Sequence, residues 1–365
     1  MARGAKSAEI TVRTPGGRYG VLVWPGALAL AGEELEKLAP GRPWAIITDR
    51  NVWKYWGKSL EAALGRRYLL VSIPPGEEQK SLAVAERICE QLVRQGADRT
   101  SILIAFGGGV VGDLAGFVAS VFLRGVEYIQ IPTTLLAQID SSVGGKTGVN
   151  LRAGKNLVGT FYQPKRVLAD PEVLRTLPHR ELRAGLFEAA KCGVLRKSLF
   201  DFLERRRDDL LRRNAGALAE LVGRAVRLKA WVVGRDEKEA GLRRVLNLGH
   251  TVGHALEAET GYRYFLHGEA VAWGLRAATL IAQEGGMIGE RAAARIHGLV
   301  KSLGPLPPLV RLSPGRLAAR LLADKKTRGG QVHFILPERI GRVRVVTGIE
   351  AAAVVRALEQ LCNEK

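Results

Sequence analysis

Short apolar runs separated by helical stretches dominate the first half of the chain. Some runs alternate with polar residues and others are continuous, which is typical of half-buried and fully buried strands respectively. The predicted strands are residues 9–24 (two strands joined by a turn), 44–49, 67–73 and 101–106. Because helical stretches such as Leu82 to Gln95 lie between them, the pattern predicts an α/β fold with a parallel sheet.

The period of the apolar positions changes near residue 180. From Glu181 to about Leu303 the sequence is rich in Ala, Leu, Arg and Glu with helical spacing. Residues 324–346 indicate a basic loop followed by a β-hairpin, and residues 351–361 a last helix. A chain of 365 residues also favours two domains. We therefore expect an α/β domain over 1–178 and a mostly α-helical domain over 179–365.

The charge and the cysteine content narrow the class of protein. The formal net charge is +19, from 55 Lys and Arg against 36 Asp and Glu. Because basic and acidic residues are mixed, as in LERRRDDLLRR (203–213), we expect solvated helix faces and a small anionic substrate, not nucleic acid. No apolar run or leader predicts a membrane segment. Three widely spaced cysteines favour a reducing cytoplasm.

A glycine-rich turn, GGGVVGD (Gly107–Asp113), follows a predicted strand directly. Its glycines match G-x-G-x-x-G, in which backbone N–H groups at a helix N-terminus approach a pyrophosphate. The turn follows a later strand than is usual for a dinucleotide site, and the expected acidic residue downstream is missing. Asp49, at the end of an earlier strand, could bind the ribose instead. A purely structural glycine turn is the alternative.

Polar and glycine residues fill residues 123–164. Asp140, Lys146, Lys155 and Asn156 lie among glycines, where a backbone can approach a ligand. Two lysines in such a place suit a phosphate or a carboxylate. The alternative is a long, well-ordered surface loop, since the segment is too apolar to be disordered.

Three of the six histidines lie in one short segment. His250 and His254 are four residues apart and share one helix face, and His267 returns after a loop. Histidines that converge in this way favour a zinc site. Thr251 excludes the H-E-x-x-H protease motif. Histidines lining an interface are the alternative, although His267 and the adjacent Glu269 favour the metal.

Glu188 and Lys191 lie three residues apart on the first predicted helix of the second domain. This spacing puts the two side chains on one face. They could form an ordinary surface ion pair, but their apolar neighbours indicate partial burial.

Taken together, six motifs in order resemble the 3-dehydroquinate synthase family of the sugar phosphate cyclases. They are GGGVVGD, IPTTLLAQIDSSVGGKTGVN, GKNLVGTFYQP, FEAAKCG, LNLGHTVGHALE and LHGEAVAWG. The likeness covers nearly the whole chain, most densely from Gly76 to Lys326. It implies an NAD-binding α/β domain, a helical metal-binding domain and a homodimer. The reaction implied converts 3-deoxy-D-arabino-heptulosonate 7-phosphate to 3-dehydroquinate and phosphate, by transient oxidation with NAD, β-elimination, re-reduction and aldol closure.

The resemblance also implies the metal and substrate residues. It assigns Zn²⁺ or Co²⁺ to Glu188, His250 and His267, and so moves His254 from the metal to the substrate. It implies that Arg124 reaches the substrate phosphate of the neighbouring subunit. The other substrate residues are Asp140, Lys146, Asn156, Lys191, Lys229, Arg243, Asn247 and one of Lys325 and Lys326.

For NAD the resemblance implies residues after several predicted strands. They are Asp49, Glu77, Lys80, Gly109, Val110, Val111, Gly112, Asp113, Thr133, Thr134, Lys146, Lys155, Val173, Leu174, Arg175 and Thr176. GEEQK stands where many relatives have GEQYK, but its equal length keeps Glu77 and Lys80 in register. Two alternatives stay open: a related cyclase such as 2-deoxy-scyllo-inosose synthase, whose substrate lacks a carboxylate, and a polyol dehydrogenase, which would release NADH. The basic residues and the full QIDSSVGGKTGVN stretch favour the 3-dehydroquinate synthase family over both alternatives.

Overall fold

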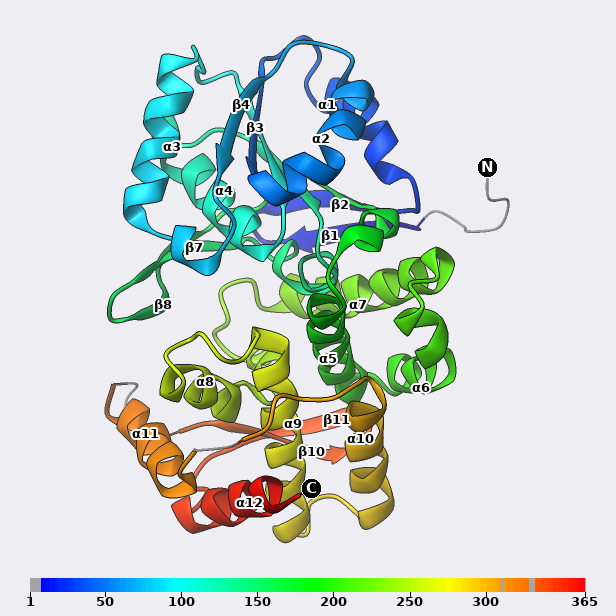
Figure 1. Cartoon of the computed structure of the whole chain (residues 1–365), viewed down its shortest axis with the longest axis vertical. Coiled ribbons are helices and arrows are strands. Elements are labelled where there is room, and N and C mark those ends of the chain that lie inside the picture. The colour runs from blue at the N-terminus through cyan, green and yellow to red at the C-terminus, as the bar shows by residue number, and fades with distance from the viewer. Residues whose placement is uncertain (1–7, 310–311, 328–331, 365) are drawn as a thin grey trace. The chain divides into compact units, whose positions relative to one another are not determined.

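The computed structural model of the chain describes residues 8–309, 312–327 and 332–364, and it leaves the side chains of 322–327 undescribed. The chain forms two compact units (Figure 1). The first consists of Met1–Pro178 with Arg213–Lys238, and the second of His179–Arg212 with Glu239–Lys365. The first unit therefore includes residues 213–238, which return to it after residues 179–212 of the second unit.

A seven-stranded sheet forms the centre of the first unit, and only its first two strands are antiparallel. In spatial order the strands are β1 (Ala8–Thr14), β2 (Gly17–Val23), β9 (Arg166–Ala169), β6 (Tyr128–Pro132), β5 (Ile102–Gly107), β3 (Trp44–Asp49) and β4 (Leu69–Ile73). All six residues of β5 are buried, as expected for a parallel strand covered on both faces. The predicted α/β fold with a parallel-dominated sheet is confirmed.

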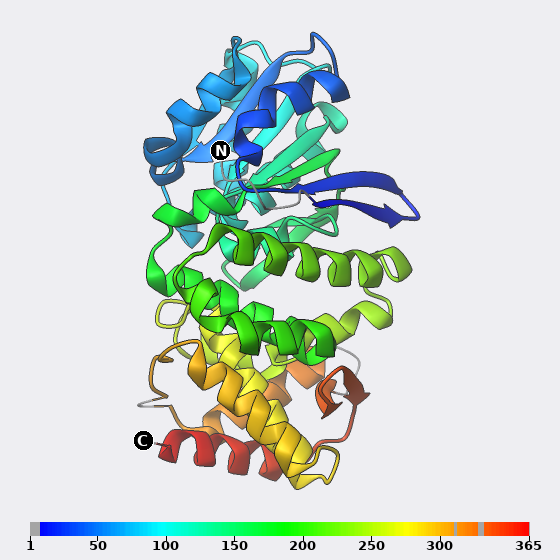
Figure 2. The ribbon, with the colours of Figure 1, turned by 90° about the vertical axis from the view of Figure 1, so that its right-hand side faces the viewer.

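Helices cover the sheet of the first unit. They are η1 (Ala27–Leu30), α1 (Ala31–Leu38), α2 (Arg50–Leu64), η2 (Glu77–Gln79), α3 (Leu82–Arg94), α4 (Gly109–Val121), η3 (Phe122–Arg124), η5 (Pro171–Thr176) and α7 (Ala215–Arg235). Leu114 and Val118 of α4 join Ile88 of α3 in a core against the strands. Helix α7 packs against β1, which explains why it belongs to this unit; Figure 2 shows it beside the dark blue β1–β2 pair.

The glycine-rich segment 123–164 is not one long loop. After β6 it forms a π-helical turn, η4 (Ala137–Ser141), and then an antiparallel hairpin of β7 (Lys146–Leu151) and β8 (Gly154–Phe161). The hairpin requires glycine at some positions because the backbones of its two strands are in close contact there. A Cβ at Gly159 would lie 2.1 Å from the carbonyl oxygen of Thr147. A glycine that permits contact between strands therefore resembles a loop glycine in the sequence.

The second unit is helix-rich, as predicted. Its elements are α5 (His179–Leu195), α6 (Lys197–Leu211), η6 (Leu242–Asn247), α8 (His250–Glu259), α9 (His267–Glu284), α10 (Glu290–Ser302), α11 (Pro314–Thr327), β10 (Phe334–Arg339), β11 (Arg342–Val346) and α12 (Ala351–Asn363). Helix α9 is central, since it contacts α5, α8, α10, α12 and β10. The predicted hairpin is β10–β11, whereas α11 extends through Thr327. Among the described helices, none is long and apolar enough to span a bilayer.

Candidate active site

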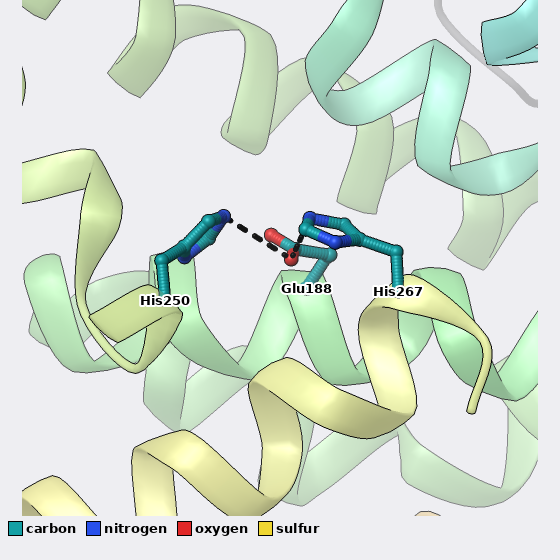
Figure 3. Close-up of side chains that lie close together, drawn as sticks. All are labelled: Glu188, His250 and His267. Atoms are coloured by element: carbon teal, nitrogen blue, oxygen red, sulfur yellow. Dashed lines mark ion pairs between the residues drawn. The ribbon is translucent and has the colours of Figure 1, made fainter. Parts of the chain in front are cut away.

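Three helices of the second unit bring Glu188, His250 and His267 together (Figure 3). Glu188 comes from α5, while His250 and His267 are the first residues of α8 and α9. The Nε2 atoms of His250 and His267 lie 3.8 and 3.5 Å from Oε1 of Glu188. Ligand atoms bound to one zinc ion would be about 3.3 Å apart, given metal–nitrogen distances of about 2.0 Å in a tetrahedron. The spacing therefore suits a divalent metal.

Two glycines explain how these helices come so close. A Cβ at Gly268 of α9 would lie 2.0 Å from the carbonyl oxygen of Ala184 in α5. A Cβ at Gly274 would lie 1.8 Å from the carbonyl oxygen of Gly249, the residue before α8. Because only hydrogen fits at these two points, the backbones of the three ligand-bearing segments are in direct contact.

The environment of Glu188 supports a metal. Its side chain is fully buried, and neither carboxylate oxygen has a hydrogen-bond partner in the described part of the chain. Lys191 Nζ lies 2.6 Å from Oε2 as an ion pair, outside the angles of a hydrogen bond. Both side chains are buried almost completely, which is more than the partial burial predicted from the sequence. A buried carboxylate with so few partners is costly, and a cation between Glu188 and the histidines would satisfy it.

The two histidines differ in their pKa. Burial, followed by the positive charge of Lys191, holds the pKa of His250 well below its ordinary value. Burial also acts to lower the pKa of His267, but the carboxylates of Glu257 and Glu188 outweigh it and raise that pKa. A metal binds the neutral imidazole. His250 is therefore already in the ligand form, whereas at His267 a metal competes with a proton.

His254 lies beside this group. Its ring stacks on that of His267 at a centroid separation of 5.9 Å, and its side chain is exposed. His254, Glu257 and His267 form a second set with one ligand atom each within 4.8 Å of the others. Geometry alone thus permits both sets. The burial and the unsatisfied oxygens of Glu188 favour the set with His250.

Two acidic residues near the histidines have distinct positions. Glu269, which the sequence associates with the metal, accepts a hydrogen bond from the Leu266 amide at 2.8 Å and binds Arg180 at 2.7 Å. It therefore stabilises the start of α9. Glu257 is 1% exposed and lies against His267. Sequence reasoning passed over it, because its place among helical residues carries no sign of burial beside a histidine.

Apart from Lys146 and Lys155, which lie on the β7–β8 hairpin, the residues predicted for NAD lie at one edge of the sheet in the first unit. They follow the carboxyl ends of β3, β4, β5, β6 and β9, which run parallel to their neighbours in this part of the sheet. In open α/β sheets this edge is where nucleotides bind. Asp49 ends β3, and its Oδ1 accepts hydrogen bonds from the amides of Asn51 and Val52, so it caps α2.

The glycine turn begins α4 at this edge. Gly108 occupies the N-cap position and no side chain caps the helix. A Cβ at Gly108 would lie 2.8 Å from Thr134 Cγ2, and one at Gly112 would lie 2.8 Å from Gln130 Oε1. The turn therefore packs closely on β6 while it leaves the first amides of α4 directed outward from a helix N-terminus. The hydroxyl of Thr133 is buried without a partner among the described residues.

A polar network connects the loop after β4 with the β7–β8 hairpin. Lys80, only 5% exposed, places Nζ 2.5 Å from Asp113 Oδ2 and donates to Asn156 Oδ1. Burial raises the pKa of Asp113, and the charge of Lys80 opposes that shift. Asn150 donates to Glu77 Oε1 at 2.8 Å and accepts from the Asn156 amide at 2.9 Å. Asn150 is a second residue that sequence reasoning missed.

The last predicted NAD segment forms η5, and its side chains are engaged within the unit. Val173 and Leu174 are buried, and the Arg175 guanidinium lies 4.5 Å from the Trp56 ring. Trp56 Nε1 donates to the hydroxyl of Thr176 at 2.8 Å.

The residues predicted for the substrate fall in both units. In the first, Lys229 of α7 donates to the carbonyl oxygen of Asp140 at 2.6 Å and pairs with its carboxylate. Lys146 begins β7, while Lys155 and Asn156 lie on β8. In the second, Lys191 lies beside Glu188, and the η6 turn carries Arg243 and Asn247; Asn247 donates to Glu239 at 2.6 Å. The side chains of Lys325 and Lys326 lie outside the described residues.

Arg124 ends η3 with an exposed side chain. Its φ is 70° and that of Leu123 is 49°, so two consecutive side-chain-bearing residues are left-handed. Glu127 does not pair with Arg124, because its carboxylate binds Arg42 and Lys165. Within the ranges that the structure covers, Arg124 forms no hydrogen bond or ion pair.

Solved structures with this fold define the class of protein. A 2-epi-5-epi-valiolone synthase from Streptomyces hygroscopicus subsp. jinggangensis, with NAD⁺ and Zn²⁺ bound, is 31% identical and matches 94% of this chain and 96% of its own, with a TM-score of 0.85. A 2-deoxy-scyllo-inosose synthase complexed with carbaglucose-6-phosphate, NAD⁺ and Co²⁺ is 25% identical. The match covers 97% of this chain and 99% of that one, with a TM-score of 0.85. The chain thus has the fold of the sugar phosphate cyclases.

Sequence relatives identify the family within that class. Profiles described as 3-dehydroquinate synthase N-terminal and C-terminal match residues 70–184 and 185–327. The 3-dehydroquinate synthase of Koribacter versatilis is 50% identical over 97% of this chain and 98% of its own. The 3-dehydroquinate synthase of Solibacter usitatus is 48% identical over 95% of this chain and 97% of its own. This chain belongs to the 3-dehydroquinate synthase family.

Proposed function

We propose that the chain converts 3-deoxy-D-arabino-heptulosonate 7-phosphate to 3-dehydroquinate and phosphate. One observation carries the proposal: the buried carboxylate of Glu188, without a hydrogen bond in the described structure, faces two histidine Nε2 atoms in a chain of this family. A polyol dehydrogenase could share the fold. The identity of about one half with 3-dehydroquinate synthases over nearly the whole chain favours the cyclase.

Glu188, His250 and His267 would hold a divalent metal, Zn²⁺ or Co²⁺. When bound, the metal supplies Lewis acidity that polarises a substrate hydroxyl or carbonyl oxygen. Three protein ligands leave at least one coordination position for that oxygen. Lys191 is fully buried next to Glu188, so its ammonium group would add positive charge beside the metal site.

The edge of the sheet in the first unit would hold NAD. The uncapped amides of α4 suit the pyrophosphate, and Asp49 suits the ribose, since the capping hydrogen bonds use one of its two carboxylate oxygens. Glu77, Lys80 and Asp113 are held in place by the network with the β7–β8 hairpin. NAD supplies reversible hydride acceptance. Because the substrate is oxidised and then reduced again, no net NADH accumulates.

Basic side chains among the residues predicted for the substrate would bind its anionic groups. Lysine and arginine suit its phosphate and carboxylate through charge-assisted hydrogen bonds. Asp140 holds the ammonium group of Lys229 in position. His254 is exposed beside His267, where its imidazole can accept or donate a proton. The residues proposed to contact the substrate or to position those that do are Arg124, Asp140, Lys146, Asn156, Lys191, Lys229, Arg243, Asn247 and His254, with Lys325 or Lys326.

The proposal includes a homodimer in a reducing, cytoplasmic environment. Arg124 supports the dimer, because an exposed guanidinium on a left-handed backbone, without a partner within the described residues, is available to another subunit. Among the described residues Cys89, Cys192 and Cys362 form no disulfide, which supports the reducing environment.

Turnover of the heptulosonate phosphate tests the proposal. Phosphate release, formation of 3-dehydroquinate and NADH absorbance would be recorded together, with catalytic NAD and Zn²⁺ or Co²⁺. We expect product and phosphate in equal amounts without accumulation of NADH. A hexose 6-phosphate, which lacks the carboxylate, serves as the control substrate. Cyclisation of the hexose alone would indicate another cyclase, and NADH formed in step with product would indicate a dehydrogenase.

A further inference from the structure

Glu257 is a buried carboxylate that the proposed reaction does not use. It lies on the third turn of α8 and is 1% exposed. A carboxylate is rarely this buried unless it is paired. Its Oε2 lies 3.1 Å from Nδ1 of His267, which belongs to the next helix. The carboxylate therefore contacts a proposed metal ligand at Nδ1, the ring nitrogen that would not bind the metal.

The two nitrogens of the His267 ring have different neighbours. Nδ1 faces Glu257, and Nε2 lies 3.5 Å from Oε1 of Glu188. Because a carboxylate accepts hydrogen bonds, the proton of the neutral ring belongs on Nδ1. This tautomer leaves the Nε2 lone pair directed toward Glu188, where the cation would lie.

His250 has the same division of roles with a weaker partner. Its Nδ1 lies 3.2 Å from the carbonyl oxygen of Leu248, and its Nε2 lies 3.8 Å from Glu188. Both histidines thus direct Nε2 to one point, and both have an acceptor at Nδ1. The Nδ1 partner of His267 is a carboxylate, whereas that of His250 is a neutral carbonyl. The side chain of His267 is 34% exposed and that of His250 is 11% exposed. The more exposed ring has the stronger partner.

We infer that Glu257 is a positioning residue that fixes His267 in the Nδ1-protonated tautomer and so tightens binding of the divalent metal. The inference rests on the proposed metal site. Carboxylates that accept a hydrogen bond from a metal-ligating histidine commonly contribute about ten- to a hundredfold in affinity. The competing arrangement makes Glu257 itself a ligand, together with His254 and His267.

Three variants and one metal titration test the inference. Metal-free protein would be titrated with Zn²⁺ against a chelator, and the Co²⁺ absorption spectrum would be recorded. We expect Glu257→Gln to bind Zn²⁺ about tenfold more weakly and Glu257→Ala up to about a hundredfold. The matched control is Glu259→Gln on the same helix, whose carboxylate pairs with Arg316 and Arg320 and with no histidine in the described part of the chain. It should retain wild-type affinity and spectrum.

The tautomer of His267 provides a readout that needs neither metal nor activity. Nitrogen-15 spectra of the metal-free protein would resolve its six histidines, with His267→Ala to assign the signal. The spectra would be recorded at a pH above the raised pKa of His267, where its ring is neutral, and we expect Nδ1–H in the wild type and a mixed tautomer in Glu257→Ala. An unfolding midpoint of metal-free Glu257→Gln close to that of the wild type, together with weaker metal binding, would support positioning over a purely structural role.

The outcomes separate the inference from the proposed function. Wild-type affinity in both Glu257 variants, or a neutral His267 with its proton on Nε2 in the wild type, would overturn the inference alone. Loss of the metal in His254→Ala and Glu257→Gln but not in Glu188→Gln would make Glu257 a ligand and overturn it as well. A wild-type protein that binds neither Zn²⁺ nor Co²⁺ would instead overturn the proposed function.

Discussion

Individual residues in the second unit differ in role mainly through burial. Glu188 and Lys191 are completely buried, whereas His254, which shares a helix face with His250, is exposed. A buried carboxylate favours a cation because water cannot solvate it. An exposed imidazole can exchange protons with solvent or substrate. Residues of one type, on one helix, are therefore suited to different chemistry.

The two neighbouring histidines should respond differently to substitution. We expect His267→Ala to lose the metal, because it removes one of three ligands. His254→Ala should keep the metal and lose about a hundred- to ten-thousandfold in kcat, as is typical of an acid–base group. Bound metal would be counted after gel filtration, and kcat measured with saturating Zn²⁺. Loss of the metal in His254→Ala would favour the set with Glu257.

His297 should make the protein less stable in weak acid. It lies on α10, where Arg276 Nε donates to its Nδ1 at 3.3 Å and its Nε2 is buried without a partner in the described structure. Burial, followed by the charge of Arg276, lowers its pKa from 6.5 to about 4. Between these two values the unfolded chain binds a proton that the folded chain does not. The free energy of unfolding therefore falls as the pH is lowered through this window.

Urea unfolding of the metal-free protein at about pH 7 and about pH 5 measures this effect. The wild type should lose about 1 kcal/mol more than His297→Gln between these conditions, after allowance for solvent screening. The control His179→Gln changes an exposed histidine at the start of α5 and should behave like the wild type. Equal losses in all three proteins would contradict the prediction.

At the scale of elements, direct backbone contact between helices sets the metal group. Helices α5 and α9 meet at Gly268, directly after His267, and α9 meets the residue before α8 at Gly274. The three ligands stand at or near these contacts. Any increase in the helix separation therefore moves a ligand directly, without a flexible side chain to absorb the change.

Gly268→Ala should weaken both the fold and the metal site. Its Cβ would lie 2.0 Å from the backbone oxygen of Ala184, so the helices must separate. We expect a loss of about 1–3 kcal/mol in the free energy of unfolding, as for other overpacked cores. Displacement of His267 should also lower Zn²⁺ affinity by about tenfold or more, equivalent to about 1.4 kcal/mol.

A second helical glycine provides the matched control. Gly298 lies within α10, and a Cβ there would meet no atom within 4 Å. Gly298→Ala should therefore stabilise the protein by about 0.5–1 kcal/mol through helix propensity and leave Zn²⁺ affinity unchanged. Thermal unfolding and chelator competition measure both quantities. A Gly268→Ala protein as stable as Gly298→Ala would show that the close contact is unimportant.

At the scale of the whole molecule, the two units supply different chemistry. The first carries a sheet edge suited to a dinucleotide, and the second carries the histidine–carboxylate group. Neither unit is a simple stretch of sequence, because Arg213–Lys238 belongs to the first. Lys229, on that returning segment, pairs with Asp140 within the first unit. Dividing the chain into two fragments after Pro178 would therefore separate Lys229 from Asp140.

Mixed dimers test whether Arg124 acts across subunits. An Arg124→Ala chain and a His267→Ala chain, each inactive alone, would be mixed so that subunits exchange. If Arg124 acts on the neighbouring subunit, one of the two sites in a mixed dimer carries neither defect. Exchange of equal amounts makes about half of the dimers mixed, so the activity of the mixture should return to about a quarter of the wild type. If Arg124 acts within its own subunit, each site has one defect and the mixture stays inactive. Differently tagged chains would confirm exchange.

The sequence by itself determined the elements and the family. Strands such as β3 and β5 are buried on both faces, so burial leaves a continuous apolar run that can be recognised without coordinates. The glycine turn at α4 and the histidines of α8 are local patterns, and the order of the motifs indicates the family. These features can be predicted because each depends on residues that are neighbours in the sequence.

The tertiary structure alone decided how distant residues meet. The β7–β8 hairpin, the return of α7 to the first unit, and the contact of Glu257 with His267 each join segments whose spacing carries no periodic signal. The same holds for Gly268, which looks like any helical glycine until Ala184 lies against it. Hydrophobic periodicity records whether a side chain is buried, whereas the partner it meets depends on how the elements pack.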